Sequence, residues 1–138
     1  MTLPSDVQDR LTCVANLLER PDRLDGVRIR CCAELLRTAV ERSVARACGA
    51  ENTDQPVHAL LIGLSSHVDA DVAHDASQLW HALSRAIRHH GYELTPAVAE
   101  LIGWHADTAA VSEALQPALT LSGTIDLAEG TGETAAVR

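Results

Sequence analysis

A short stretch late in the chain, SRAIRHHGYEL (residues 84–94), gathers the residue types best suited to chemistry. It carries two arginines and two adjacent histidines, followed at once by Gly91 and Tyr92. Imidazole groups exchange protons near neutral pH, and guanidinium groups hold oxyanions through paired hydrogen bonds. The same residues also fit a plain helix end, where a protonated histidine faces the exposed carbonyls and glycine lets the backbone leave the helix. Both interpretations stay open from geometry alone.

Histidines also recur upstream of this stretch. On a helix with 3.6 residues per turn, His67, His74, His81 and Arg85 fall within about 40° of one another. A metal site would pair histidines four residues apart, but the residue four after His74 is Gln78, a poor ligand. We therefore favour a solvated polar face and predict neither a metal nor another cofactor. A metal site built from His74, His81 and a neighbour is the alternative.

The amino-acid composition predicts the kind of fold that positions these residues. With 138 residues, 46% of them hydrophobic, the chain suits one domain with one core. Aromatic residues make up only 2% and Phe is absent, so the core must be built from Leu, Val, Ile and Ala. Leu and Ala are strong helix formers, whereas strands favour aromatic and β-branched residues. The prediction is an all-α protein.

The cysteines and the apolar runs bear on the compartment. Cys13, Cys31, Cys32 and Cys48 match no zinc-binding spacing, and each falls in a helical apolar pattern, which predicts buried free thiols. No signal peptide opens the sequence, and no apolar run approaches the roughly 20 residues of a membrane span. We expect a cytoplasmic protein with no membrane partner.

Charge is distributed unevenly along the chain. The net charge is −8, which argues against broad electrostatic capture of nucleic acid. Residues 1–48 carry eight arginines against seven carboxylates, a net +1, while residues 49–138 carry three arginines against twelve carboxylates, a net −9. Any contact with nucleic acid must therefore be local.

Periodicity and stop signals predict helices over about 5–20, 24–47, part of 58–66, about 69–89 and about 97–116. We predict a bundle of four to five helices in a single domain over residues 1–120, followed by a flexible tail over residues 121–138. The apolar stripes run through Val27 and Cys31 in the second helix and through Leu101 and Ile102 in the last.

The second of these helices carries five arginines, and only Glu34 and Glu41 oppose them within it. The favoured interpretation is a solvated face of Glu–Arg pairs. The alternative is a basic strip beside the functional site. The arginines are Arg28, Arg30, Arg37, Arg42 and Arg46.

Taken as R-x4-H-G-Y, the sequence from Arg85 to His90, Gly91 and Tyr92 resembles the motif of the HEPN superfamily of small helical domains. The order of helices over about residues 25–115 is also similar. The resemblance implies a homodimer whose two motifs meet in a cleft, and metal-independent endoribonuclease activity of the kind found in toxin–antitoxin and defence proteins. An antitoxin or other protein would then be a further partner beside RNA.

The resemblance also implies roles for single residues. His90 would be the acid or base at the 2′-hydroxyl or the leaving 5′-oxygen, and Arg85 would clamp the scissile phosphate. Secondary binding contacts would come from four more side chains, His81, Arg88, His89 and Tyr92, with packing the favoured role for the tyrosine.

One position departs from the family pattern. HEPN ribonucleases usually place a polar residue directly after the motif arginine, and this chain has Ala86 there. Together with the acidic net charge, this keeps a second hypothesis open, in which the chain is a non-catalytic HEPN-like binding or partner domain that forms a homodimer.

Overall fold

The computed structural model describes residues 3–88 and 97–116, and these residues form a helical bundle without strands. The long helices are α1 (Ser5–Leu18), α2 (Gly26–Ala47), α4 (Ala70–Arg88) and a last helix over residues 98–116. Between α2 and α4 lie α3 (Val57–Gly63) and a 3-10 turn, Leu64–Ser66; a second 3-10 turn, Pro21–Arg23, joins α1 to α2. The predicted all-α fold is confirmed, and the predicted tail over 121–138 lies outside the described residues.

Local chemistry explains where α2 begins and ends. Asp25 caps it, since its Oδ1 accepts a hydrogen bond from the backbone N–H of Arg28 at 2.8 Å. After Ala47 the chain leaves the helix through Gly49, whose φ of 66° lies in the left-handed region that glycine adopts without strain. The helix α1 starts after Pro4 without any side-chain cap.

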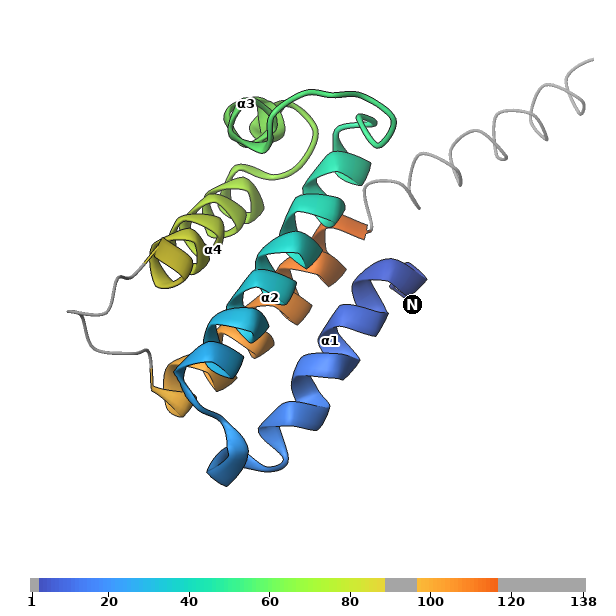
Figure 1. Cartoon of the computed structure of the whole chain (residues 1–138). Helices are drawn as coiled ribbons and strands as arrows, with labels where there is room; N and C mark the ends of the chain where they lie inside the picture. Colours follow the sequence, from blue (N-terminus) through green and yellow to red (C-terminus); the bar gives the residue numbers. More distant parts are fainter. Residues whose placement is uncertain (1–2, 89–96, 117–138) are drawn as a thin grey trace, which may run out of the picture.

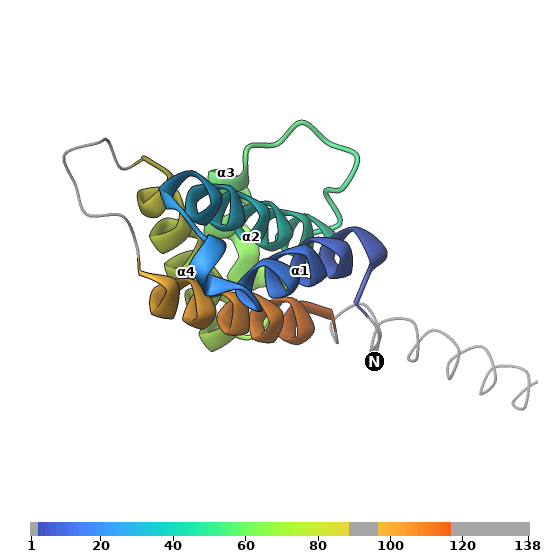
Figure 2. The same cartoon turned by 60° about the horizontal axis from the view of Figure 1, so that its bottom comes forward.

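The helix α2 is the centre of the bundle. In Figure 1, α1 lies along one side of α2 and α4 along the other, and the last helix passes behind α2; Figure 2 shows it running beside both α1 and α4. The largest fully buried side chains are aliphatic, as the composition predicted, and include Leu36 and Val40 of α2, Leu83 of α4 and Leu101 of the last helix. Burial of this apolar surface is the main stabilising contribution.

Two sequence-based expectations about burial are wrong. Cys13 and Cys31 are exposed, and Val27 and Ile102 are 65% and 52% exposed. Helical spacing predicts that α2 has an apolar stripe, but small apolar residues on both sides of the stripe hide which residues form its centre. The buried face of α2 runs through Cys32 and not through Val27 and Cys31. Burial, with smaller contributions from the neighbouring thiols of Cys13 and Cys31, raises the pKa of Cys32 to about 11.

None of the described helices is both long enough and apolar enough to span a bilayer.

Candidate functional site

The helix α4 presents the predicted site residues on its outer face. Ala76, Leu79 and Leu83 are buried, as the helical spacing predicted, whereas His81, Arg85 and Arg88 are exposed. Asp71 lies in its first turn and both arginines lie in its last turn, where each charge sign suits the helix dipole. The arginines therefore contribute to helix stability whatever else they do.

A cation from α2 meets this end of α4. Arg37 Nη1 lies 3.5 Å from the hydroxyl oxygen of Ser84, a fully buried residue directly before Arg85 and one turn before Arg88. The Nε of Arg37 is buried and has no hydrogen-bond partner among the described residues. We call Arg37, Arg85 and Arg88 the arginine cluster.

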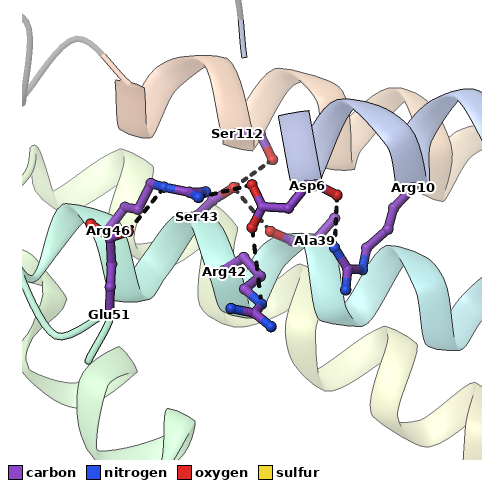
Figure 3. Close-up of polar contacts among 8 residues, drawn as sticks. All are labelled: Asp6, Arg10, Ala39, Arg42, Ser43, Arg46, Glu51 and Ser112. Carbon is purple, nitrogen blue, oxygen red and sulfur yellow. Dashed lines mark hydrogen bonds and ion pairs between the residues drawn. The ribbon is translucent and has the colours of Figure 1, made fainter. Parts of the chain in front are cut away.

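The arginine cluster differs from the other arginines of α2 in its ion pairs. Arg46 pairs with Asp6 of α1 at 2.8 Å and with Glu51 at 3.3 Å, as Figure 3 shows, and Arg42 approaches Asp6 at 4.0 Å. Arg28 forms an ion pair at 3.3 Å with Asp25, the residue that caps α2.

The ion pairs of Arg28, Arg42 and Arg46 are therefore with Asp25, Asp6 and Glu51, and not with Glu34 or Glu41. Within residues 3–88 and 97–116, no member of the arginine cluster lies within 4.0 Å of a carboxylate. Glu41, one turn beyond Arg37, instead accepts a hydrogen bond from Trp80 Nε1 at 3.3 Å. Glu34 is exposed one turn before Arg37, so it is the carboxylate of α2 that flanks the cluster.

A group of aromatic rings lies one to two turns before the arginines of α4. The ring of His81 packs edge-on against Trp80, with centroids 5.1 Å apart, and His58 of α3 lies 6.2 Å from His81 and 6.5 Å from Trp80. Both histidines are exposed and the tryptophan is half-buried. We call His58, Trp80 and His81 the ring cluster.

The ring cluster was not anticipated from the sequence apart from His81. His58 comes from a separate helix, and spacing along one helix carries no information about which residue of another helix will face it. The predicted stripe partner His74 is exposed on α4, and His67 lies outside α4, at the end of the preceding 3-10 turn.

The alternative of a metal site gains no support from the described part of the chain. Among residues 3–88 and 97–116, no group of three or more His, Cys, Asp or Glu side chains is placed to hold a metal ion. Within the described ranges His81 has one imidazole neighbour, His58, and the Glu41 carboxylate is bonded to Trp80.

The remaining site residues divide into two sets. His89, His90 and Tyr92 lie outside the described residues, so the distance from Arg85 to the motif histidine is not defined by the structure. Ala86 is described and is only 3% exposed, so it packs into the core.

Comparison with protein-family models, with curated proteins and with solved structures finds no match for this chain. The resemblance to HEPN domains therefore rests on the R-x4-H-G-Y sequence and the order of the helices.

The described arrangement can hold an anion. The guanidinium groups of Arg85, Arg88 and Arg37 lie at or beside the end of α4 and have no carboxylate partner among the described residues. A half-buried cation such as Arg37 is costly to leave unpaired. Aromatic rings about two turns from Arg88 add flat surfaces on which a planar group can stack. Phosphate beside a planar base combines both kinds of ligand.

Proposed function

We propose that the face formed by α2 and α4 binds single-stranded RNA, and that the chain is a HEPN-like RNA-associated protein. The observation that carries the proposal is Arg37, a half-buried cation that has no carboxylate partner among residues 3–88 and 97–116. Its guanidinium lies beside Ser84, the residue directly before Arg85 and one turn before Arg88. Arg85 and Arg88 are exposed, so an RNA phosphate could accept charge-assisted hydrogen bonds from them and offset the nearby positive charge of Arg37.

The ring cluster favours single-stranded over double-stranded RNA. Proteins recognise unpaired bases by stacking them on aromatic side chains and on arginine planes, whereas duplexes hide the base faces. His81 and Arg88 are seven residues apart on α4, a rise of about 10 Å, which matches about three stacked nucleotide steps of 3.4 Å. A strand of about four nucleotides would therefore contact both clusters.

Catalysis on this face would follow the HEPN pattern and need no metal. His90 takes the proton of the 2′-hydroxyl or gives one to the leaving 5′-oxygen, and Arg85 stabilises the charge that develops on the phosphate. In a homodimer two arginine clusters act together, which locally offsets the net charge of −8. Such an enzyme fits a toxin of a toxin–antitoxin pair or a defence ribonuclease in the cytoplasm.

The second candidate function is RNA binding without cleavage, by a HEPN-like partner domain. It is favoured by the burial of Ala86, because the position after the motif arginine holds no polar side chain and faces the core. The two candidates share the binding face and differ in whether the bound strand is cut.

One experiment tests cleavage. Purified protein and the His90→Ala variant are incubated with a mixed RNA pool in EDTA. Cleavage by the wild type alone supports the ribonuclease, and intact RNA with both proteins supports the binding domain. Equal cleavage by both removes His90 from the mechanism.

A second experiment tests the face itself, by fluorescence anisotropy with a labelled single-stranded RNA. We expect Arg37→Gln and Arg85→Gln each to weaken binding about tenfold, the loss of roughly one charge-assisted hydrogen bond. Arg42→Gln is the matched control, since it removes the same charge from the α1 side of the same helix. Equal losses in all three variants would refute the assignment to this face.

A further inference from the structure

A cleft of about 450 Å³ opens between α4 and the last helix, and none of its lining residues belongs to the arginine cluster or the ring cluster. On α4 its lining residues are spaced as one helical face, Asp75, Gln78, Leu79 and Ala82, and Trp104 and Asp107 face them from the last helix. The volume falls within the roughly 300–1,000 Å³ of small-molecule sites. The apolar floor with a few polar groups is also typical of such sites.

The tryptophan of this cleft is available to a ligand. Trp80 of the ring cluster is occupied by two histidine rings and by a carboxylate. Trp104 is half-buried like Trp80, yet within the described residues neither its ring nor its indole N–H has a partner. An indole face is the aromatic surface that attracts cations most strongly.

The carboxylates of the cleft are available as well. Asp75 and Asp107 are exposed, and neither forms an ion pair with a described residue. No arginine or histidine of the described chain lines the cleft. The neighbouring His105 is turned away, because its Nε2 bonds to the backbone oxygen of Leu11 in α1 at 3.0 Å.

We infer that this cleft binds a small organic polycation, an aliphatic diamine or polyamine with two or more ammonium groups on an apolar stem. One ammonium lies over Trp104 beside Asp107, a second reaches Asp75, and the methylene chain covers Leu79 and Ala82. The ammonium groups of the ligand would contact the carboxylates and the indole face, and its methylene groups would contact the apolar floor of the cleft.

Two other occupants fit less well. A docked protein would be expected to bury exposed apolar residues at the centre of its interface. In the part of the chain that the structure describes, the exposed large hydrophobic residues are Val27, Ile62 and Ile102, and none of them lines the cleft. An anionic ligand such as RNA would face two uncompensated carboxylates. The cleft therefore serves a ligand other than the RNA proposed for the α2–α4 face.

The test is calorimetric titration of the full chain with spermidine at a fixed ionic strength of about 0.15 M, where diffuse attraction is screened. We expect saturable binding at one site per chain. Asp75→Asn and Asp107→Asn should each weaken it about tenfold, which corresponds to about 1.4 kcal/mol. Both residues are exposed, so neither change should unfold the protein.

The matched control is Glu113→Gln, which removes one negative charge from an exposed position of the same last helix outside the cleft. It should bind spermidine within twofold of the wild type. In a Trp80→Phe background the fluorescence of Trp104 should change in step with the heat. An equal loss in the Glu113 variant, or no saturable heat up to millimolar spermidine, would overturn the inference. Arg37→Gln should leave spermidine binding unchanged, which separates this site from the RNA face.

Discussion

Replacing Asp6 with asparagine tests the polar contact that joins α1 to α2. In Figure 3, Asp6 points from the first turns of α1 toward Arg46, whose Nη2 donates a hydrogen bond to Asp6 Oδ1 at 2.8 Å. The two side chains are 28% and 24% exposed, so water screens the pair only in part. This contact is therefore worth more than a typical surface ion pair, which contributes about 0–1 kcal/mol.

The magnitude follows from what the variant loses. A hydrogen bond to a charged group contributes about 1.5–3 kcal/mol, and a carboxylate near a helix N-terminus adds about 0.3–1 kcal/mol. The amide oxygen of the introduced asparagine would still accept a hydrogen bond, and Arg46 keeps Glu51 at 3.3 Å. We therefore expect the free energy of unfolding at pH 7 to fall by about 1.5–2.5 kcal/mol, and Tm to fall by about 5–10 °C for a chain of this size.

The loss of stability in Asp6→Asn should depend on pH, and the pKa of Asp6 determines the direction of that dependence. Burial by itself would raise the pKa of Asp6, but the hydrogen bond and the charge of Arg46 outweigh it, and the pKa lies below its ordinary 3.8. A lowered folded-state pKa stabilises the protein above the unfolded pKa of about 3.9, and this contribution is lost as the pH falls through the folded value. The difference between wild type and variant should therefore shrink below about pH 4.

Urea unfolding followed by circular dichroism at 222 nm measures the effect at pH 7 and pH 3. Asp9→Asn is the control, since it makes the same change at an exposed position of the same helix and should stay within about 0.5 kcal/mol of the wild type. An equal loss for both variants, or a loss for Asp6→Asn that is undiminished at pH 3, would refute the reasoning.

Three further predictions concern the core. Leu83→Ala should destabilise the fold by about 2–5 kcal/mol in urea unfolding, because the side chain is fully buried and leaves a cavity; a loss under 1 kcal/mol would contradict the packing. Ala86→Asn should lower the urea midpoint, since a buried amide without partners costs about 1–3 kcal/mol, and should not increase RNA cleavage; more cleavage at unchanged stability would be the contrary result. With a pKa near 11, Cys32 should resist iodoacetamide at pH 8 while the exposed Cys13 and Cys31 react, as peptide mass spectrometry can establish; equal labelling rates would contradict its burial.

The sequence predicts well those features that one helix determines alone. The range predicted for α1 ends two residues beyond Leu18, and the apolar face of α4 is placed correctly through Ala76, Leu79 and Leu83. The first follows from the proline after the helix and the second from the 3.6-residue period, which are local properties. Burial on α2 is harder to place, because this central helix contacts neighbours on several sides and its stripe has no sharp edge.

Contacts between helices could not be predicted in the same way. The pairing of Arg37 with Ser84, and of Trp80 with Glu41, depends on the register at which α2 and α4 pack, and that register is set by how the two apolar faces interlock. The same holds for His58, which reaches the ring cluster from a third helix. The sequence supplied the candidate Arg85, and the packing supplied its neighbours.

The packing also explains why the near-neutral net charge of residues 1–48 does not describe the local charge on either side of α2. A net +1 suggests arginines and carboxylates in balanced pairs, yet the two sides of α2 are not balanced separately. Toward α1, Arg46 is neutralised by Asp6 and Glu51; toward α4, Arg37 has no carboxylate within ion-pair distance among the described residues. Because a Coulomb interaction weakens with distance and salt screens well-separated charges, the local imbalance matters more than the sum. An acidic protein can thus carry a cationic face, and this is the property that the proposed binding of RNA requires.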